Sequence, residues 1–181
     1  MAELTMTVQD FVDAGACYEH EQIEELFAGR EALSALDILD LDIPDNDKLW
    51  AVLREMLIPA RTLYLLAVEF ARAALLKERE AGREPDERCW RALDVRLAWL
   101  DGKASDEELR AAWDATQSVF YSRFNGDTPS WHAALAASWT ARPQPWTATY
   151  IAYRSRSNAG YANVAQSEQV DIVRRMLRGE R

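Results

Sequence analysis

The sequence has few of the residues on which most enzyme chemistry depends. Its 181 residues include two histidines, two cysteines and seven glycines. The glycines form neither a phosphate-binding loop nor a dinucleotide-binding fingerprint, because both motifs need several glycines at short fixed spacings. Cys17 and Cys89 have neither the spacing of a zinc site nor the number that a disulfide framework needs. We therefore expect no catalytic site, no metal and no cofactor, and we interpret both cysteines as buried thiols in a reducing compartment.

Long apolar segments are also missing. The longest run, Leu63 to Val68, is far shorter than the roughly 20 residues that cross a bilayer. The N-terminus does not show the basic segment and apolar stretch of a secretory signal. We therefore expect no membrane association and a cytoplasmic location in a bacterium or phage-infected cell. An apolar content of 49% is nevertheless ample for a packed core.

Negative charge is concentrated at the front of the chain. Residues 1–50 hold thirteen of the 30 acidic residues but two of the 21 basic ones, a net charge of −11, whereas residues 51–181 carry +2. A field of one sign attracts cationic surfaces and repels nucleic acid. The distribution favours a basic protein partner over direct binding to DNA or RNA.

Helical periodicity runs through most of the chain. Between residues 59 and 80, inward-facing apolar residues recur at spacings of three and four: Leu63, Leu66, Ala67, Phe70, Ala74 and Leu76. Thr7 with Asp10, and Ser105 with Glu108, have the spacing of N-terminal capping boxes. Other predicted helices include 7–14, 18–28, 30–39, 48–58, 106–124, 146–157 and 161–178.

The predicted fold is all-α, a bundle of about nine helices with no sheet, because strand alternation is nowhere sustained. We expect one domain over residues 1–181. Its parts are an acidic subregion at 1–47, a helical core at 48–125, and Trp- and Arg-rich helices at 128–181.

Nine acidic residues of the front form the candidate binding site. They are Glu19, Glu21, Glu24, Glu25, Asp37, Asp40, Asp42, Asp45 and Asp47. Clustered carboxylates accelerate association with a cationic surface and make binding sensitive to salt. The alternative is a solvated acidic face that only aids solubility.

Tryptophan and arginine distinguish the second half of the chain. Four tryptophans on apolar stripes are predicted to be core residues, namely Trp50, Trp90, Trp99 and Trp113. Three others lie near prolines and turns, so they are secondary candidates for exposed binding anchors, namely Trp131, Trp139 and Trp146. Residues 141–181 hold seven arginines, which we interpret as complementing the last helix dipole and pairing with the acidic front.

The two histidines offer weak alternatives. His20 lies one turn before Glu24, a spacing that could hold a divalent metal, but a second cluster of ligands is missing. His132 could act as a general base between helices, but the sequence nominates no nucleophile beside it. We therefore interpret His20 as part of a solvated face and His132 as a surface or core-edge residue.

Three blocks carry a resemblance to known sequences: residues 58–75, 86–115 and 169–177, with further likeness at 13–27. The matching positions are Ala71, Arg72, Ala74, Leu75, Trp99, Gly102, Ser105, Glu107, Glu108, Leu109 and Arg110. In this order they resemble uncharacterised Ala-rich helical proteins of phages and bacteria, and they are similar to proteins described as immunity partners of bacterial toxins. The likeness ends near residue 116, where the alanine repeats of that pattern give way to tryptophan, proline and arginine.

The resemblance implies a phage or bacterial accessory protein that acts by binding, and it brings no catalytic residues. Together with the charge distribution, it leads to the hypothesis of a non-enzymatic inhibitor of a basic, nucleic-acid-handling target such as a toxin or a defence complex. Two alternatives stay open: a self-assembling protein, such as a homodimer formed through the aromatics of 131–161, and an enzyme with a site near His132.

Overall fold

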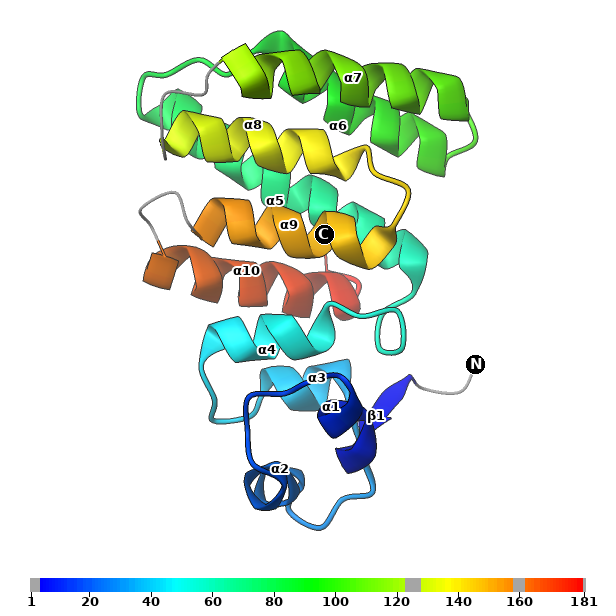
Figure 1. The fold of residues 1–181 in the computed structure, drawn as a ribbon, viewed down its shortest axis with the longest axis vertical. Coiled ribbons are helices and arrows are strands. Elements are labelled where there is room, and N and C mark those ends of the chain that lie inside the picture. The colour runs from blue at the N-terminus through cyan, green and yellow to red at the C-terminus, as the bar shows by residue number, and fades with distance from the viewer. Residues whose placement is uncertain (1–3, 123–127, 158–161, 181) are drawn as a thin grey trace.

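Ten helices and one short two-stranded sheet make up the described part of the chain, which comprises residues 4–122, 128–157 and 162–180 of a computed structural model (Figure 1). The helices are α1 (Val8–Asp13), α2 (His20–Phe27), α3 (Ala35–Leu39), α4 (Asp45–Val52), α5 (Ala60–Glu80), α6 (Glu87–Leu100), α7 (Asp106–Ser122), α8 (Pro129–Thr140), α9 (Pro145–Ser157) and α10 (Ala162–Leu177). The fold is therefore mostly α, with one helix more than the expected nine.

The expectation that the chain has no sheet was wrong. β1 (Thr5–Thr7) and β2 (Ala32–Ser34) pair antiparallel, with Met6 opposite Leu33. Both side chains are fully buried. A three-residue strand is too short to show alternation, so only the pairing of segments far apart in sequence reveals it. The predicted helix at 30–39 is correspondingly shorter, because α3 begins after β2.

Local capping chemistry begins α1 and α7 where the sequence predicts, whereas the helix predicted at 48–58 is α4, which runs from Asp45 to Val52. The Asp10 N–H donates to Thr7 Oγ1, and the Thr7 N–H donates to Asp10 Oδ2 (2.8 Å), which completes the capping box of α1. Ser105 and Glu108 exchange the same pair of bonds at the start of α7. Gly102, with a φ of +69°, ends α6 in the left-handed region that favours glycine.

The helices stack along the long axis of the molecule. In Figure 1, α6 and α7 lie at one end, α5, α8 and α9 form the centre, α10 and α4 follow, and α1 to α3 form the other end. α5 packs against both α8 and α9, while α10 packs against α4 and α9. The acidic front therefore occupies one end of the molecule.

Two apolar cores lie on either side of α5. The larger core contains Leu63, Leu66 and Phe70 of α5 together with buried residues of α1–α4, α9 and α10. The second core contains Val68 and Leu75 of α5, Val119 of α7 and buried residues of α6 and α8. A helix that buries opposite faces in two cores couples both halves of the molecule.

The predicted inward residues are confirmed for α5, with one exception. Leu63, Leu66, Ala67, Phe70 and Ala74 are buried, but Leu76 is 40% exposed. The four tryptophans predicted as core residues, Trp50, Trp90, Trp99 and Trp113, are half-buried rather than enclosed. The indole ring is too large to be covered completely in these thin layers of helices.

Only one of the two cysteines is buried as expected. Both are free thiols, but only Cys89 is buried, in the second core. Cys17 is exposed in the loop before α2. The interpretation of Cys17 as a buried residue was therefore wrong, because the loop lies on the surface.

Candidate functional site

Four of the candidate carboxylates belong to the short helix α2 and the residue before it. Ile23 and Phe27 face the core, and Glu21, Glu24 and Glu25 are exposed. Their spacings of three and four residues place these three glutamates on one side of the helix. Glu19 precedes the helix and is exposed too. The side of α2 away from the core is thus a continuous anionic face, which we call the α2 acidic face (Glu19, Glu21, Glu24 and Glu25).

The α2 acidic face has little internal neutralisation. His20 Nε2 lies 3.4 Å from Glu24 Oε1, and both side chains are mostly exposed. Among the described residues, the four glutamates form no ion pair with a lysine or an arginine. Like charges at these spacings cost the helix a few tenths of a kcal/mol each. Glu19 and Glu21 lie at the start of α2, where a carboxylate is favourable, whereas Glu24 and Glu25 bring the helix no such gain.

Two of the remaining candidate carboxylates, Asp37 and Asp45, have partners close by in the sequence. Asp37 bonds the N–H and hydroxyl of Ser34 at the start of α3, and it lies 3.1 Å from Arg30. The hydrogen bonds from Ser34 lower the pKa of Asp37. Asp45 pairs with Lys48 at 3.6 Å, a spacing within α4. These groups shape the helix starts, as carboxylates at an N-terminus do.

Among the described residues, one ion pair joins the arginines of residues 141–181 to the acidic residues of 1–50. Arg174 of α10 lies 3.0 Å from Asp40 and donates to the carbonyl oxygen of Leu39. The side chains of Arg154, Arg156 and Arg181 lie outside the described residues. Asp42, in the loop between α3 and α4, is exposed and has no ion pair among the described residues. The predicted pairing of front and tail therefore neutralises Asp40 and leaves Asp42 and the α2 acidic face available.

Asp47 bonds a tyrosine rather than a cation. The Tyr18 hydroxyl donates to Asp47 Oδ2 at 2.6 Å and ties the loop before α2 to α4. Burial raises the pKa of Tyr18 to about 12, and the bond to Asp47 adds to this effect. The phenol therefore stays protonated well above the pH at which a free tyrosine ionises, about 10.

This shift predicts a loss of stability in alkali. Because the folded pKa exceeds the unfolded one, the contribution of Tyr18 is complete below about pH 10 and is lost as the pH rises toward about 12. We expect the unfolding free energy of the wild type to fall more between about pH 9 and about pH 11 than that of Tyr18→Phe, measured by urea unfolding. Tyr121→Phe, at a residue that is 68% exposed, is the control and should follow the wild type. An equal fall in wild type and Tyr18→Phe contradicts the prediction.

The three secondary tryptophan candidates are not equivalent. Trp131 and Trp139 are half-buried, and the ring of Trp139 lies 4.1 Å from the guanidinium carbon of Arg142. Trp146 is 42% exposed and meets Tyr150 edge-on at 5.3 Å between ring centroids. Of the three, only Trp146 offers a surface aromatic group, so the alternative of self-assembly would depend mainly on this residue.

His132, the residue of the enzyme alternative, lies inside the molecule. It is 4% exposed in α8 and meets the ring of Trp131 edge-on at 4.8 Å. Of the two positions expected for His132, at the surface or at the edge of the core, its burial in α8 excludes the surface. It does not face bulk water, so the enzyme alternative is not removed by its position.

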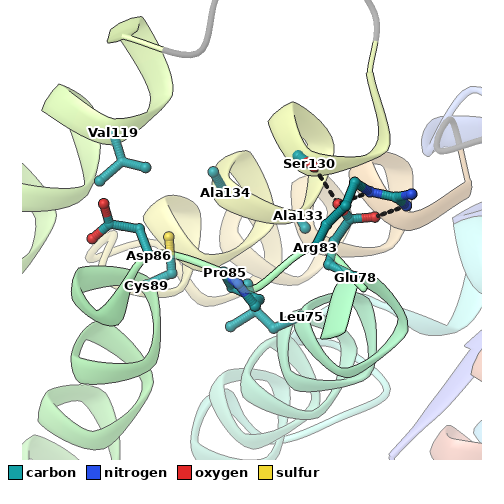
Figure 2. A pocket seen from close by; sticks show the side chains of 10 residues that line it. All are labelled: Leu75, Glu78, Arg83, Pro85, Asp86, Cys89, Val119, Ser130, Ala133 and Ala134. Carbon is teal, nitrogen blue, oxygen red and sulfur yellow. Dashed lines mark hydrogen bonds and ion pairs between the residues drawn. The ribbon is translucent and has the colours of Figure 1, made fainter. Parts of the chain in front are cut away.

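The polar cluster at the end of α5 is a further place where chemistry could occur (Figure 2). Glu78 accepts two hydrogen bonds from Arg83, at 2.7 and 2.9 Å, and one from the Ser130 hydroxyl. The enclosed cavity beside it, lined also by Cys89 and Pro85, has a volume of about 10 Å³. That is the space of one water molecule. We interpret the cluster as an anchor that joins α5 to the start of α8.

The described ranges hold neither a candidate metal cluster nor a membrane-spanning helix. They contain no group of three or more His, Cys, Asp or Glu side chains arranged to hold a metal ion. No helix within them is both long enough and apolar enough to span a bilayer.

Fold and site together define a mostly helical protein with a charged surface at one end and two cores joined by a central helix. Comparisons with protein-family models, curated protein sequences and solved structures find no match to this chain. The resemblance to phage and bacterial helical proteins therefore stays a prediction.

Proposed function

We propose that this protein is a non-enzymatic inhibitor that binds a basic, nucleic-acid-handling protein through the α2 acidic face and Asp42. The single observation that carries the proposal is the side of α2 on which Glu21, Glu24 and Glu25 are exposed without a lysine or arginine partner among the described residues. A cationic surface would supply the missing counter-charges.

The position of the face supports this proposal. α2 lies at the far end of the stacked helices (Figure 1), where a large partner can approach it without meeting the central bundle. The helix is held from beneath by Ile23 and Phe27, both buried in the larger core. Carboxylates on a rigid helix lose less conformational freedom on binding than those on a free tail.

The chemistry of the target follows from the charge. A protein that grips phosphates presents lysine and arginine, and a cluster of carboxylates competes with phosphates for the same groups. The protein would thus block access of nucleic acid to its target. This fits a toxin–immunity pair or a phage inhibitor of a bacterial defence complex, acting in the cytoplasm.

The proposal is tested by capture from a bacterial lysate followed by competition. We expect the immobilised protein to retain a basic nucleic-acid-binding protein at about 0.1 M salt and to release it at about 1 M, because the Debye length falls from about 10 Å to about 3 Å. The purified target should lose its binding to nucleic acid, in a gel-shift assay, as the protein is added.

Two results would contradict the proposal. One is a set of retained proteins that is the same at both salt concentrations, since contact through exposed carboxylates must weaken with screening. The other is a retained protein that keeps its full affinity for nucleic acid in the presence of saturating inhibitor.

A further inference from the structure

A second surface feature lies away from the acidic end. A cavity of about 470 Å³ opens between the end of α6, the first turns of α7 and the connection from α8 to α9. Trp99, Trp113, Arg110 and Arg142 are among the residues that line it. Its volume falls in the range of small-molecule sites, which is about 300–1,000 Å³. In Figure 1, α6 and α7 lie at the end of the molecule opposite α2.

Aromatic rings and guanidinium groups are layered in the wall of this cavity. The guanidinium carbon of Arg142 lies 4.7 Å from the centre of the Trp113 ring and 4.1 Å from that of Trp139. The Trp99 indole N–H donates to Asp106 Oδ1 at 2.7 Å, which fixes that ring. Stacking of this kind holds Arg142 in place and presents flat apolar surfaces.

Two arginines, Arg110 and Arg142, and one carboxylate, Asp106, line the cavity, so its wall carries a net positive charge. Arg96 is fully buried behind it, with its guanidinium carbon 4.8 Å from the centre of the Trp99 ring, and it donates to the carbonyl oxygens of Thr140 and Arg142. Burial lowers the pKa of Arg96 to about 10, so the group is still charged at neutral pH. Within the described chain, Arg96, Arg110 and Arg142 form no ion pair.

Three buried donors around the cavity have no acceptor among the described residues. They are the indole N–H of Trp113, the Nε of Arg142 and the Nη1 of Arg96. Buried polar groups are nearly always hydrogen-bonded, so each exception calls for an explanation. All three are donors, and the two arginines lie against aromatic rings, so a group that completes their hydrogen bonding has to be an acceptor.

We propose that this cavity binds a small organic anion that carries a planar ring. The ring would pack against Trp99 and Trp113, and the anionic group would accept hydrogen bonds from Arg110 and Arg142. The anionic group can be a carboxylate or a phosphate. Aromatic carboxylates and nucleoside monophosphates are therefore the two ligand classes that fit the cavity. The site is independent of the α2 acidic face.

Three probe ligands test the proposal: indole-3-acetate, AMP and tryptamine. Indole-3-acetate and tryptamine share a ring and differ in the sign of their charge. We expect saturable binding of at least one of the two anions, with a Kd below about 1 mM by calorimetry, and at least about tenfold weaker binding of tryptamine. The anion that binds more tightly shows which of the two ligand classes the cavity prefers. In the nitrogen–proton spectrum, the indole N–H signals of Trp99 and Trp113 should shift selectively.

A matched pair of arginine variants completes the test. Arg110 is exposed, so Arg110→Gln should leave the unfolding temperature unchanged. It should weaken the binding of the anion about tenfold, which is the effect of losing one charge-assisted hydrogen bond. Arg91→Gln, at an exposed arginine nearer the start of α6 that has no ion pair among the described residues, should bind like the wild type. The proposal is overturned if neither anion binds, if tryptamine binds equally well, or if Arg110→Gln has no effect.

Discussion

Neutralising the free carboxylates should slow association with the basic target by about 10–100-fold at low salt, which is the range of electrostatic steering. The variant carries Glu21→Gln, Glu24→Gln, Glu25→Gln and Asp42→Asn. All four side chains are exposed, and among the described residues none has a lysine or arginine partner. We expect the loss to appear mainly in the association rate, measured by stopped-flow or surface plasmon resonance with the target that the capture experiment identifies.

The fold of this variant should be intact. The three glutamates repel one another at spacings of three and four residues, so their neutralisation removes a small cost from α2. Circular dichroism and the unfolding temperature check this expectation. At about 1 M salt the wild type and the variant should bind at nearly the same rate, because screening removes the contribution of exposed charges.

A control variant separates the surface from the net charge. Glu55→Gln, Glu80→Gln, Glu87→Gln and Asp94→Asn also remove four negative charges, from exposed residues without ion pairs among the described side chains. These residues lie between α4 and α6, outside the α2 acidic face. If the control slows binding as much as the first variant, total charge is responsible and the α2 acidic face has no special part.

Phe70→Ala should lower the free energy of unfolding by about 3–5 kcal/mol, the cost of truncating a buried aromatic residue and leaving a cavity. Phe70 is fully buried in the larger core, on the helix that also supplies Val68 and Leu75 to the second core. For a domain whose total stability is about 5–15 kcal/mol, such a loss is a large fraction.

The position of Phe70 also predicts how the molecule unfolds. Because α5 contributes to both cores, we expect one cooperative transition, with far-ultraviolet circular dichroism and tryptophan fluorescence changing together. Phe70→Ala should move both signals to the same lower denaturant concentration. Leu76→Ala, on the same helix but at an exposed position, is the control and should cost less than about 1 kcal/mol. Two separate transitions would show that the two cores are independent units.

Much of the local structure could be predicted from the sequence. Spacings of three and four gave the buried side of α5, and the capping boxes at Thr7 and Ser105 gave the starts of α1 and α7. These features depend on residues within one or two turns, so the sequence around them contains the required information. The concentration of charge in the first fifty residues is likewise a property of the sequence alone.

The candidate site could be predicted only in part. The sequence located the carboxylates, but not which of them are engaged. Asp40 meets Arg174 across 134 residues, and Asp47 meets Tyr18 across 29. The acidic cluster thus divides into groups with structural partners and a group that stays available, and only the packing of α10 and the loop before α2 makes that division.

The cavity beside Trp113 was missed for a similar reason. Trp99 and Trp113 lie on apolar stripes, which favours the core, and the sequence places Arg142 among the C-terminal arginines rather than in a site. Their role depends on contacts between distant parts of the chain. Arg142 lies against the rings of Trp113 and Trp139, and the buried Arg96 donates to the carbonyl oxygen of Arg142, 46 residues further along the sequence. A helix pattern specifies which side of a helix is apolar, but the partner of that side is chosen when distant helices pack. The chain alone therefore determined the helices and the acidic end, whereas the tertiary structure decided the small sheet, the free carboxylates and the arginine-lined cavity.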